Sequence, residues 1–139
     1  MRGLGELERV GVGGPVSYWV EKDSQGENSV AYIFQSGLGL PDEAYYRDED
    51  HAETLAAYKT HVAKMLGFLE PKYLQGLTPE IAAERIVNLE TQLAASHWDV
   101  VKARDAVATY NPTDLEEMPP LVRALLDASG LTGLSLIHI

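Results

Sequence analysis

Histidine is the residue type in this sequence that most readily holds a metal ion, because the chain has no cysteine. The histidines are His51, His61, His97 and His138. A helix presents two imidazoles to one metal ion when they stand four residues apart, on adjacent turns of one face. No two of these histidines have that spacing. A non-standard site with Glu49, Asp50 or Glu53 is the alternative, but we favour histidines on helix surfaces.

Carboxylates four residues apart on a helix could do acid–base chemistry. The pairs Glu49/Glu53 and Glu80/Glu84 have this spacing. Two carboxylates that share one proton can act as general acid and general base. A solvated helix face with like charges has the same pattern and is far more common. We therefore expect these pairs to be surface features and not catalytic ones.

Two other groups invite a functional interpretation. Arg104-Asp105 and Tyr110-Asn111 could contact a substrate, but we favour structural roles near a helix end. The glycines at positions 11, 13 and 14 precede a strand and have no Lys-Ser/Thr after them, so they do not make a phosphate loop. The sequence thus assigns no catalytic, cofactor-binding or metal-binding residue to this chain.

Length and charge bound the class of protein. The chain has 139 residues, enough for one domain with a modest core, and a formal net charge of −10 at pH 7. That charge argues against a nucleic-acid partner or an anionic membrane, since both need basic patches. The lack of cysteine excludes a disulfide scaffold and a cysteine nucleophile. No signal peptide or transmembrane segment is visible, so we expect a soluble chain. It is either cytoplasmic, or exported with a targeting signal upstream of a chain that starts mid-protein.

Alternating apolar residues predict a β-hairpin over about 16–35. Its strands are Val16–Val20 and Val30–Gln35, joined by turn-forming residues at 23–28. Several aromatic residues could line a peptide-binding cavity, although we expect them to pack the hairpin against helices. These are Tyr18, Trp19, Tyr32, Phe34, Tyr45 and Tyr46.

Helical periodicity extends from about 42 to 128. The expected helices span about 49–69, 79–95, 98–109 and 121–128. Asp48 and Thr78 are suitable N-caps, and Pro79 fits the first helical position after Thr78. The predicted fold class is mainly α with a β-hairpin (α+β).

Two apolar stripes are expected to face each other. The stripe of the 49–69 helix consists of Leu55, Tyr58, Val62, Met65, Leu66 and Leu69. The stripe of the 79–95 helix consists of Ala82, Ile86, Leu89 and Leu93. Little apolar surface then remains to cover the Leu121–Leu126 helix and the tail at 134–139, so we expect both to be left exposed.

The stretch Gly37–Tyr46 reads Gly-Leu-Gly-Leu-Pro-Asp-Glu-Ala-Tyr-Tyr and resembles a signature of the neprilysin-type (neprilysin/endothelin-converting-enzyme) zinc metallopeptidases. Leu89–Ala94, followed by the two polar pairs at 104–105 and 110–111, is the second matching segment. Ser96–Asp99 and the lack of cysteine are closer to the bacterial branch. The resemblance extends from about Gly13 to about Gly130.

The resemblance implies a partial helical lobe of a two-lobed metallopeptidase, in its N-terminal, non-catalytic region. In that family, a His-Glu-x-x-His helix and a downstream Glu hold zinc, and the first Glu acts as general base on the zinc-bound water. This chain has no His-Glu-x-x-His, so no catalytic residue is carried over to it. Zinc is implied for the parent enzyme only. The implied partners are the missing catalytic lobe of the same polypeptide and, in the intact enzyme, peptide substrates.

The last six residues, 134–139, read Leu-Ser-Leu-Ile-His-Ile and match the translated mosaic end of a transposase-based sequencing adapter. We expect residues 134–139 to be a non-native tail and residues 1–133 to be a fragment of the peptidase N-terminal domain. A natural apolar tail is the alternative.

Two functions of different class follow. The first is a truncated N-terminal-domain fragment of a neprilysin-like zinc metalloendopeptidase, which shapes or gates the substrate cavity and is inactive alone. The alternative is a free-standing helical protein-interaction module without enzymatic activity.

Overall fold

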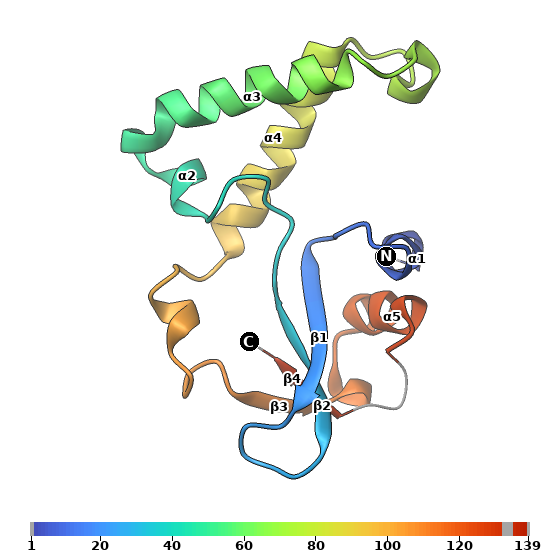
Figure 1. Ribbon diagram of the computed structural model, residues 1–139, viewed down its shortest axis with the longest axis vertical. Coiled ribbons are helices and arrows are strands. Elements are labelled where there is room, and N and C mark those ends of the chain that lie inside the picture. Colours follow the sequence, from blue (N-terminus) through green and yellow to red (C-terminus); the bar gives the residue numbers. More distant parts are fainter. Residues whose placement is uncertain (1, 132–134, 139) are drawn as a thin grey trace. The chain divides into compact units, whose positions relative to one another are not determined.

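The computed structural model describes residues 2–131 and 135–138 and contains helices and one small sheet (Figure 1). The fold class is therefore α+β with a predominance of helix, as the sequence predicts. The chain forms two compact units. The first consists of residues 1–37 and 101–139, and the second consists of residues 38–100.

The predicted hairpin forms the start of the first unit. β1 (Val16–Lys22) and β2 (Ser29–Gln35) pair antiparallel, with Trp19 opposite Tyr32. Because Tyr18 pairs with Ile33, these two side chains point to the same face of the hairpin. The hairpin prediction is thus confirmed.

Two short strands make the sheet larger than predicted. They are β3 (Asn111–Asp114) and β4 (Ser135–His138), and the strand order is β1-β2-β4-β3. β4 runs parallel to β2 and antiparallel to β3. The sequence predicts a helix stop at 111–112 and a non-native tail at 134–139, and neither segment has enough alternation to indicate a strand by itself.

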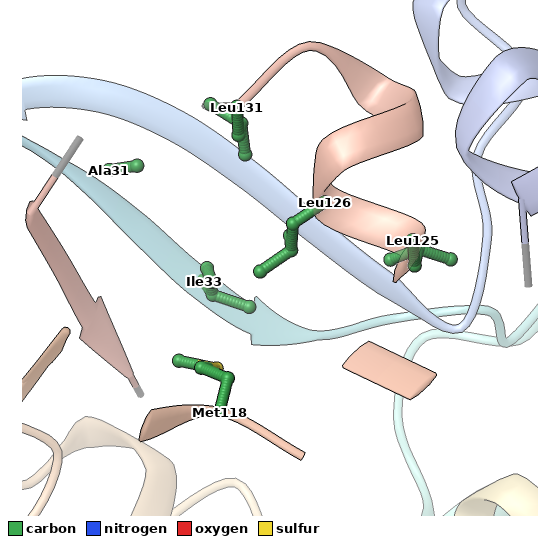
Figure 2. Packing of buried hydrophobic residues seen from close by; sticks show 6 residues of the cluster. All are labelled: Ala31, Ile33, Met118, Leu125, Leu126 and Leu131. Carbon is green, nitrogen blue, oxygen red and sulfur yellow. The ribbon is translucent and has the colours of Figure 1, made fainter. Parts of the chain in front are cut away.

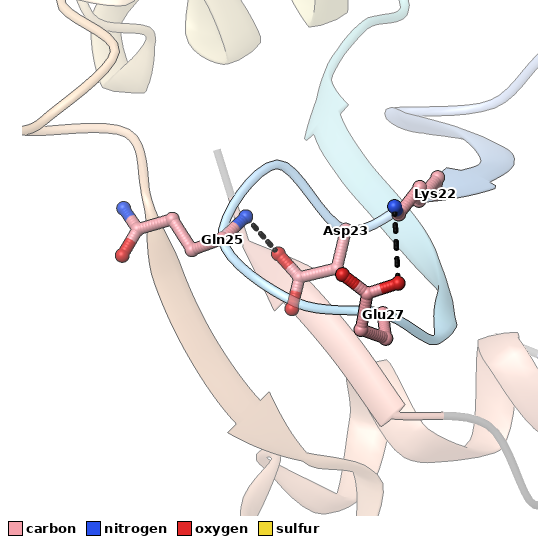
Figure 3. Close-up of polar contacts among 4 residues, drawn as sticks. All are labelled: Lys22, Asp23, Gln25 and Glu27. Atoms are coloured by element: carbon pink, nitrogen blue, oxygen red, sulfur yellow. Dashed lines mark hydrogen bonds and ion pairs between the residues drawn. The ribbon is translucent and has the colours of Figure 1, made fainter.

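The hairpin loop is held by its own polar groups (Figure 3). The Asp23 carboxylate accepts a hydrogen bond from the Gln25 N–H at 2.9 Å, which is the turn that aspartate favours. Lys22 and Glu27 form an exposed ion pair at 3.3 Å. The Tyr32 hydroxyl accepts a bond from the loop N–H of Ser24 at 3.0 Å. These contacts fix the register of the two strands.

The core of the first unit lies between β2 and α5 (Pro120–Ser129) (Figure 2). Its buried members are Ala31, Ile33, Met118, Leu125, Leu126 and Leu131. The expectation that Leu121–Leu126 lacks cover is therefore wrong for Leu125 and Leu126, which are 0% exposed. The inner face of β2 supplies the cover, because the helix presents one amphipathic face to it. Leu121 lies on the outer face and is exposed.

α1 (Arg2–Arg9), a helix that the sequence pattern does not predict, packs against α5 in the first unit (Figure 1). Gly5 lies at this contact and is buried. A methyl group there would meet the Leu125 carbonyl oxygen and lie 2.7 Å from the Cβ of Ala128. The glycine thus permits a close approach of two helix backbones. In the sequence, this glycine argues against a helix at this position, because glycine has a low helix propensity.

The second unit contains α2 (Ala44–Arg47), α3 (Ala52–Leu66) and α4 (Pro79–Ser96). Short 3-10 turns over Glu49–His51 and Pro71–Leu74 precede α3 and α4. The predicted cap of α4 is confirmed, since the Thr78 hydroxyl accepts a bond from the Ile81 N–H at 3.3 Å. Asp48 makes no side-chain cap, and α3 begins later than predicted.

The contact between α3 and α4 is made by smaller residues than predicted. The buried residues of α4 are Ala82, Ala83, Val87 and Ala94. Leu89, a member of the predicted stripe, is 58% exposed. The inner face of α4 carries Glu90, whose carboxylate binds groups on α2 and α3. A polar residue therefore occupies a place where periodicity predicts only apolar ones.

The predicted helix over 98–109 is wrong. The described segment holds only a 3-10 turn at Lys102–Arg104 and a turn after Asp105. The Asp105 carboxylate accepts bonds from the N–H groups of Val107 at 2.9 Å and Ala108 at 3.1 Å. An aspartate that bonds nearby backbone groups offers the chain an alternative to a helix. These bonds also lower the pKa of Asp105.

We predict that Gly5→Ala destabilises the chain by about 1–3 kcal/mol, the usual effect of overpacking a close contact. Gly3→Ala is the matched control on the same helix, because nothing lies within 4 Å of a methyl group there. This control should be neutral or stabilising by up to about 1 kcal/mol, since alanine is the better helix former. Urea unfolding of both variants measures the difference. Equal midpoints would contradict the α1–α5 contact.

Candidate functional site

The signature loop is tied down by the hydroxyl of Tyr46, a buried residue of α2. This oxygen accepts bonds from the Gly39 N–H at 3.2 Å and the Leu40 N–H at 3.1 Å. It donates to a carboxylate oxygen of Glu90 on α4 at 2.7 Å. One hydroxyl therefore satisfies two loop N–H groups and joins the loop to α4.

The second oxygen of the same carboxylate binds α3. The Tyr58 hydroxyl donates to Glu90 Oε1 at 3.0 Å. A methyl group on Gly39 would overlap the Tyr58 hydroxyl, so this position of the loop has no room for a side chain. The loop, α2, α3 and α4 thus meet at one carboxylate. We call Tyr46, Tyr58 and Glu90 the tyrosine–glutamate network.

The network keeps its tyrosines in the neutral form. Burial raises the pKa of Tyr46 above its ordinary range, and the bond to Glu90 adds to the effect. Burial and the same carboxylate raise the pKa of Tyr58 to about 12. A tyrosine with a raised pKa is a hydrogen-bond donor and a poor general base near neutral pH. This arrangement is suited to positioning the loop and not to proton transfer.

Arg47 makes a further link between α2 and α4. Its guanidinium donates to the carbonyl oxygens of Ala94 and, at 2.7 Å, His97, at the C-terminus of α4. Cationic groups are favourable at this end of a helix, where carbonyl groups lack intrahelical partners. Arg47 directly follows Tyr45-Tyr46, so the signature and the residue after it supply both links to α4.

The residues that first suggested metal or acid–base chemistry are spread out. The His51 ring stacks on Tyr45 with centroids 4.3 Å apart, and His61 is exposed on α3. Glu84 pairs with Lys59 at 3.5 Å. Glu80 is solvent-exposed, and a bond from its own N–H, together with one from Thr78, lowers its pKa. The structure therefore does not bring the carboxylates of Glu80 and Glu84 together as a proton-sharing pair.

The zinc implied by the family resemblance does not fit the residues described here. Within residues 2–131 and 135–138, no three His, Cys, Asp or Glu side chains gather closely enough to hold a metal ion. The side chain of His138 is not among those that the structure describes.

Within residues 2–131 and 135–138, no helix has the length and apolar character needed to cross a membrane.

The aromatic residues of the hairpin divide between its two faces. Tyr18 packs against the core, and its hydroxyl donates to the Ser129 carbonyl oxygen at 3.3 Å. On the other face, Trp19 contacts Phe34 with ring centroids 4.4 Å apart and remains 45% exposed. The prediction that these aromatics pack against helices is thus confirmed for Tyr18 but not for Trp19.

Asp105, Tyr110 and Asn111, from the polar pairs at 104–105 and 110–111, have structural partners. Besides the turn at Asp105, the Tyr110 hydroxyl donates to the Asp23 carboxylate at 3.1 Å. Burial raises the pKa of Tyr110, and this bond adds to the effect. The Asn111 amide donates to the Ala108 carbonyl oxygen at 2.9 Å, just before Pro112. Asp105 and Asn111 therefore make structural contacts as predicted, but at turns and not at the end of a helix.

Glu8 of α1 has unusual surroundings for a carboxylate. Both of its carboxylate oxygens are buried without a hydrogen-bond partner, beside a cavity of about 280 Å³ that Gly11, Gly13 and Tyr18 help to line. Burial raises the pKa of Glu8. The sequence gives no signal for it, because a glutamate in a short amphipathic helix is usually solvated.

Comparison with known proteins agrees with the resemblance. The sequence model of the N-terminal region of peptidase family M13 matches residues 1–130. Human endothelin-converting enzyme 1 is 29% identical over 111 residues, which are 78% of this chain and 14% of that protein. Mouse membrane metallo-endopeptidase-like 1 is 32% identical over 105 residues, which are 69% of this chain and 13% of that protein.

Solved structures give the same result. The Mycobacterium tuberculosis zinc metalloprotease Zmp1 in complex with an inhibitor has a TM-score of 0.79 and 38% identity, over 99% of this chain and 22% of that chain. Its open state has a TM-score of 0.76 and 39% identity. The chain therefore belongs to peptidase family M13, and it corresponds to the N-terminal region of the neprilysin-type enzymes. It spans 14% of the length of human endothelin-converting enzyme 1.

We predict that Tyr46→Phe costs about 1–3 kcal/mol of stability, because two loop N–H groups and Glu90 lose a partner. Tyr58→Phe should cost about 1 kcal/mol, because it removes one bond. Tyr45→Phe is the control: it keeps the ring that stacks on His51 and should change stability by less than about 0.5 kcal/mol. Urea unfolding followed by helical circular dichroism measures all three. A Tyr46→Phe midpoint equal to that of Tyr45→Phe would contradict the network.

The network also predicts a loss of stability at alkaline pH. An unfolded tyrosine ionises near its ordinary pKa of 10.0, whereas folded Tyr58 keeps its proton to about 12. The folded state then binds more protons than the unfolded state, so stability falls as pH rises through this range. Unfolding free energies measured across pH 10 to about 12 should fall more steeply for the parent chain than for Tyr46→Phe/Tyr58→Phe. Parallel curves would show that the hydroxyls are not coupled to folding.

Proposed function

We propose that this chain is part of the non-catalytic N-terminal region of a zinc metalloendopeptidase that cleaves peptides. The observation that carries the proposal is the match of residues 1–130 to the N-terminal region of family M13 in a sequence without His-Glu-x-x-His. The similar structure of Zmp1 from Mycobacterium tuberculosis is that of a zinc metalloprotease in complex with an inhibitor. Catalysis and zinc binding then belong to a further part of the same polypeptide, and peptides are the substrates.

The role proposed for this region is to shape or gate the substrate cavity of the intact enzyme. Support comes from the hydrogen bonds that hold the signature loop. Its N–H groups are held by Tyr46, and Glu90 joins α2, α3 and α4. A wall that limits the size of substrates has to keep its shape, and polar ties of this kind hold one arrangement of helices.

Two proteins test the proposal. The 1–139 chain should bind no stoichiometric zinc and show no chelator-sensitive cleavage of a fluorogenic peptide. The gene extended in frame should encode a downstream His-Glu-x-x-His, bind zinc and cleave the same peptide. A stop codon soon after position 133 in clean genomic sequence would contradict the peptidase proposal and favour the free-standing interaction module.

The gating role has its own measurement in the extended enzyme. Tyr46→Phe should change the ratio of kcat/KM for long and short peptides by severalfold while zinc content stays constant, because the loop loses its anchor. Tyr45→Phe should leave that ratio unchanged. If the ratio of kcat/KM for long and short peptides is unchanged in both variants, the gating role is contradicted, while membership of the family is not affected.

A further inference from the structure

β4 lies inside the sheet of the first unit, between two strands that are far apart in the sequence. On one side, Ala31 and Tyr32 of β2 pair with Leu136 and Ile137 in parallel. On the other side, β3 pairs antiparallel with the same residues. Among the described residues, β2 and β3 have no direct ladder with each other. We call the space between them the strand slot.

The slot needs an occupant because β2, the strand along one side of it, carries residues of the core. Ala31 is 0% exposed and Ile33 is 1% exposed. One edge of β2 is paired with β1, and the other edge faces the slot. If no strand lay there, N–H and C=O groups of β2 would be left without partners or open to association with another chain.

The end of α5 places Leu131 in the core beside the sheet. The Gly130 N–H donates to the Asp127 carbonyl at 3.2 Å and the Leu131 N–H donates to the Leu126 carbonyl at 3.0 Å. With Gly130 at φ 94°, this is a Schellman motif, and Leu126 and Leu131 share the core as the motif favours. Leu131 is therefore anchored beneath the sheet, and β4 begins only at Ser135.

We propose that the strand slot is filled in the intact protein by an extended segment of the polypeptide that follows α5, and that Ser135–His138 stand in for that segment here. The proposal rests on the proposed function, in which the chain is part of a longer peptidase. Backbone pairing fills the slot, so the side-chain sequence of the occupant matters little. A tail of unrelated sequence could therefore pair with β2 as β4 does.

Backbone chemistry supplies a sharp test, because β4 has a partner on each side. A proline within such a central strand removes a ladder hydrogen bond and is poorly tolerated. Ile137 pairs with Tyr32 on β2 and with Pro112 on β3. Ile137→Pro should therefore empty the slot. Ile137→Val is the matched control, since it keeps the N–H and has high β propensity.

Hydrogen exchange on the full 139-residue chain is the measurement. Ile137→Pro should speed exchange of the Ala31–Ile33 amides by at least about tenfold, as expected for a locally opened edge, while Leu125 and Leu126 stay protected. Ile137→Val should match the parent chain. The free peptide Leu-Ser-Leu-Ile-His-Ile, added to Ile137→Pro, should restore protection. In the protein extended in frame with the gene's own sequence, the Ala31–Ile33 amides should be protected as well.

Four results would overturn the proposal. Unchanged exchange in Ile137→Pro would mean that β4 does not fill a slot. Loss of α5 protection without rescue by the peptide would mean that the tail is part of the core. Protection that depends on protein concentration would identify a second copy as the occupant. Unprotected Ala31–Ile33 amides in the extended protein would exclude the following segment, whether or not that protein carries a zinc motif.

Discussion

The carboxylate of Glu90 is the group on which the second unit depends, because each of its oxygens accepts a bond from a tyrosine on a different helix. Apolar packing alone provides little there. The large side chains that are fully buried among the described residues are Ile33, Leu125 and Leu126, and all three belong to the first unit. In the second unit, α4 buries mainly alanines. A satisfied polar network compensates for a small apolar contact, and losing one partner leaves the others unsatisfied.

The first unit is organised around β2 instead. This strand pairs with β1 on one edge and β4 on the other, and its inner face meets α5. Hydrophobic burial is concentrated at that one face, because Ala31 and Ile33 share a buried cluster with Leu125 and Leu126 of α5. The sequence pattern suggests no partner for these two leucines. The α1–α5 contact at Gly5 adds a second layer to the same helix. The two units thus rely on different physics, one on apolar burial and the other on hydrogen bonds.

The acidic residues show why charge patterns are weak guides to chemistry. Glu80 and Glu84 have the spacing of a proton-sharing pair, but they are solvated and bind different partners. Glu90 and Glu8, which have no distinctive spacing, are the carboxylates with unusual surroundings. Burial and neighbours determine the behaviour of a carboxylate, and neither is visible before the chain folds.

The sequence by itself determined the local features. Alternation specified the hairpin of β1 and β2, Thr78-Pro79 specified the start of α4, and the run at Gly37–Tyr46 indicated the family. These features depend on neighbouring residues, whose steric and capping preferences act within a few positions of the chain. The same local rules failed at 98–109, where the Asp105 side chain bonds the backbone and competes with a helix.

Only the tertiary structure decided which distant residues meet. The two segments that carry the family resemblance, Gly37–Tyr46 and Leu89–Ala94, come together through Tyr46 and Glu90, which are 44 residues apart. The need for a glycine at position 39 arises from the Tyr58 hydroxyl, and the need for one at position 5 arises from α5. The place of β3 and β4 depends on the free edge of β2. Such contacts follow from close packing of the folded chain, and no periodicity in the sequence encodes them.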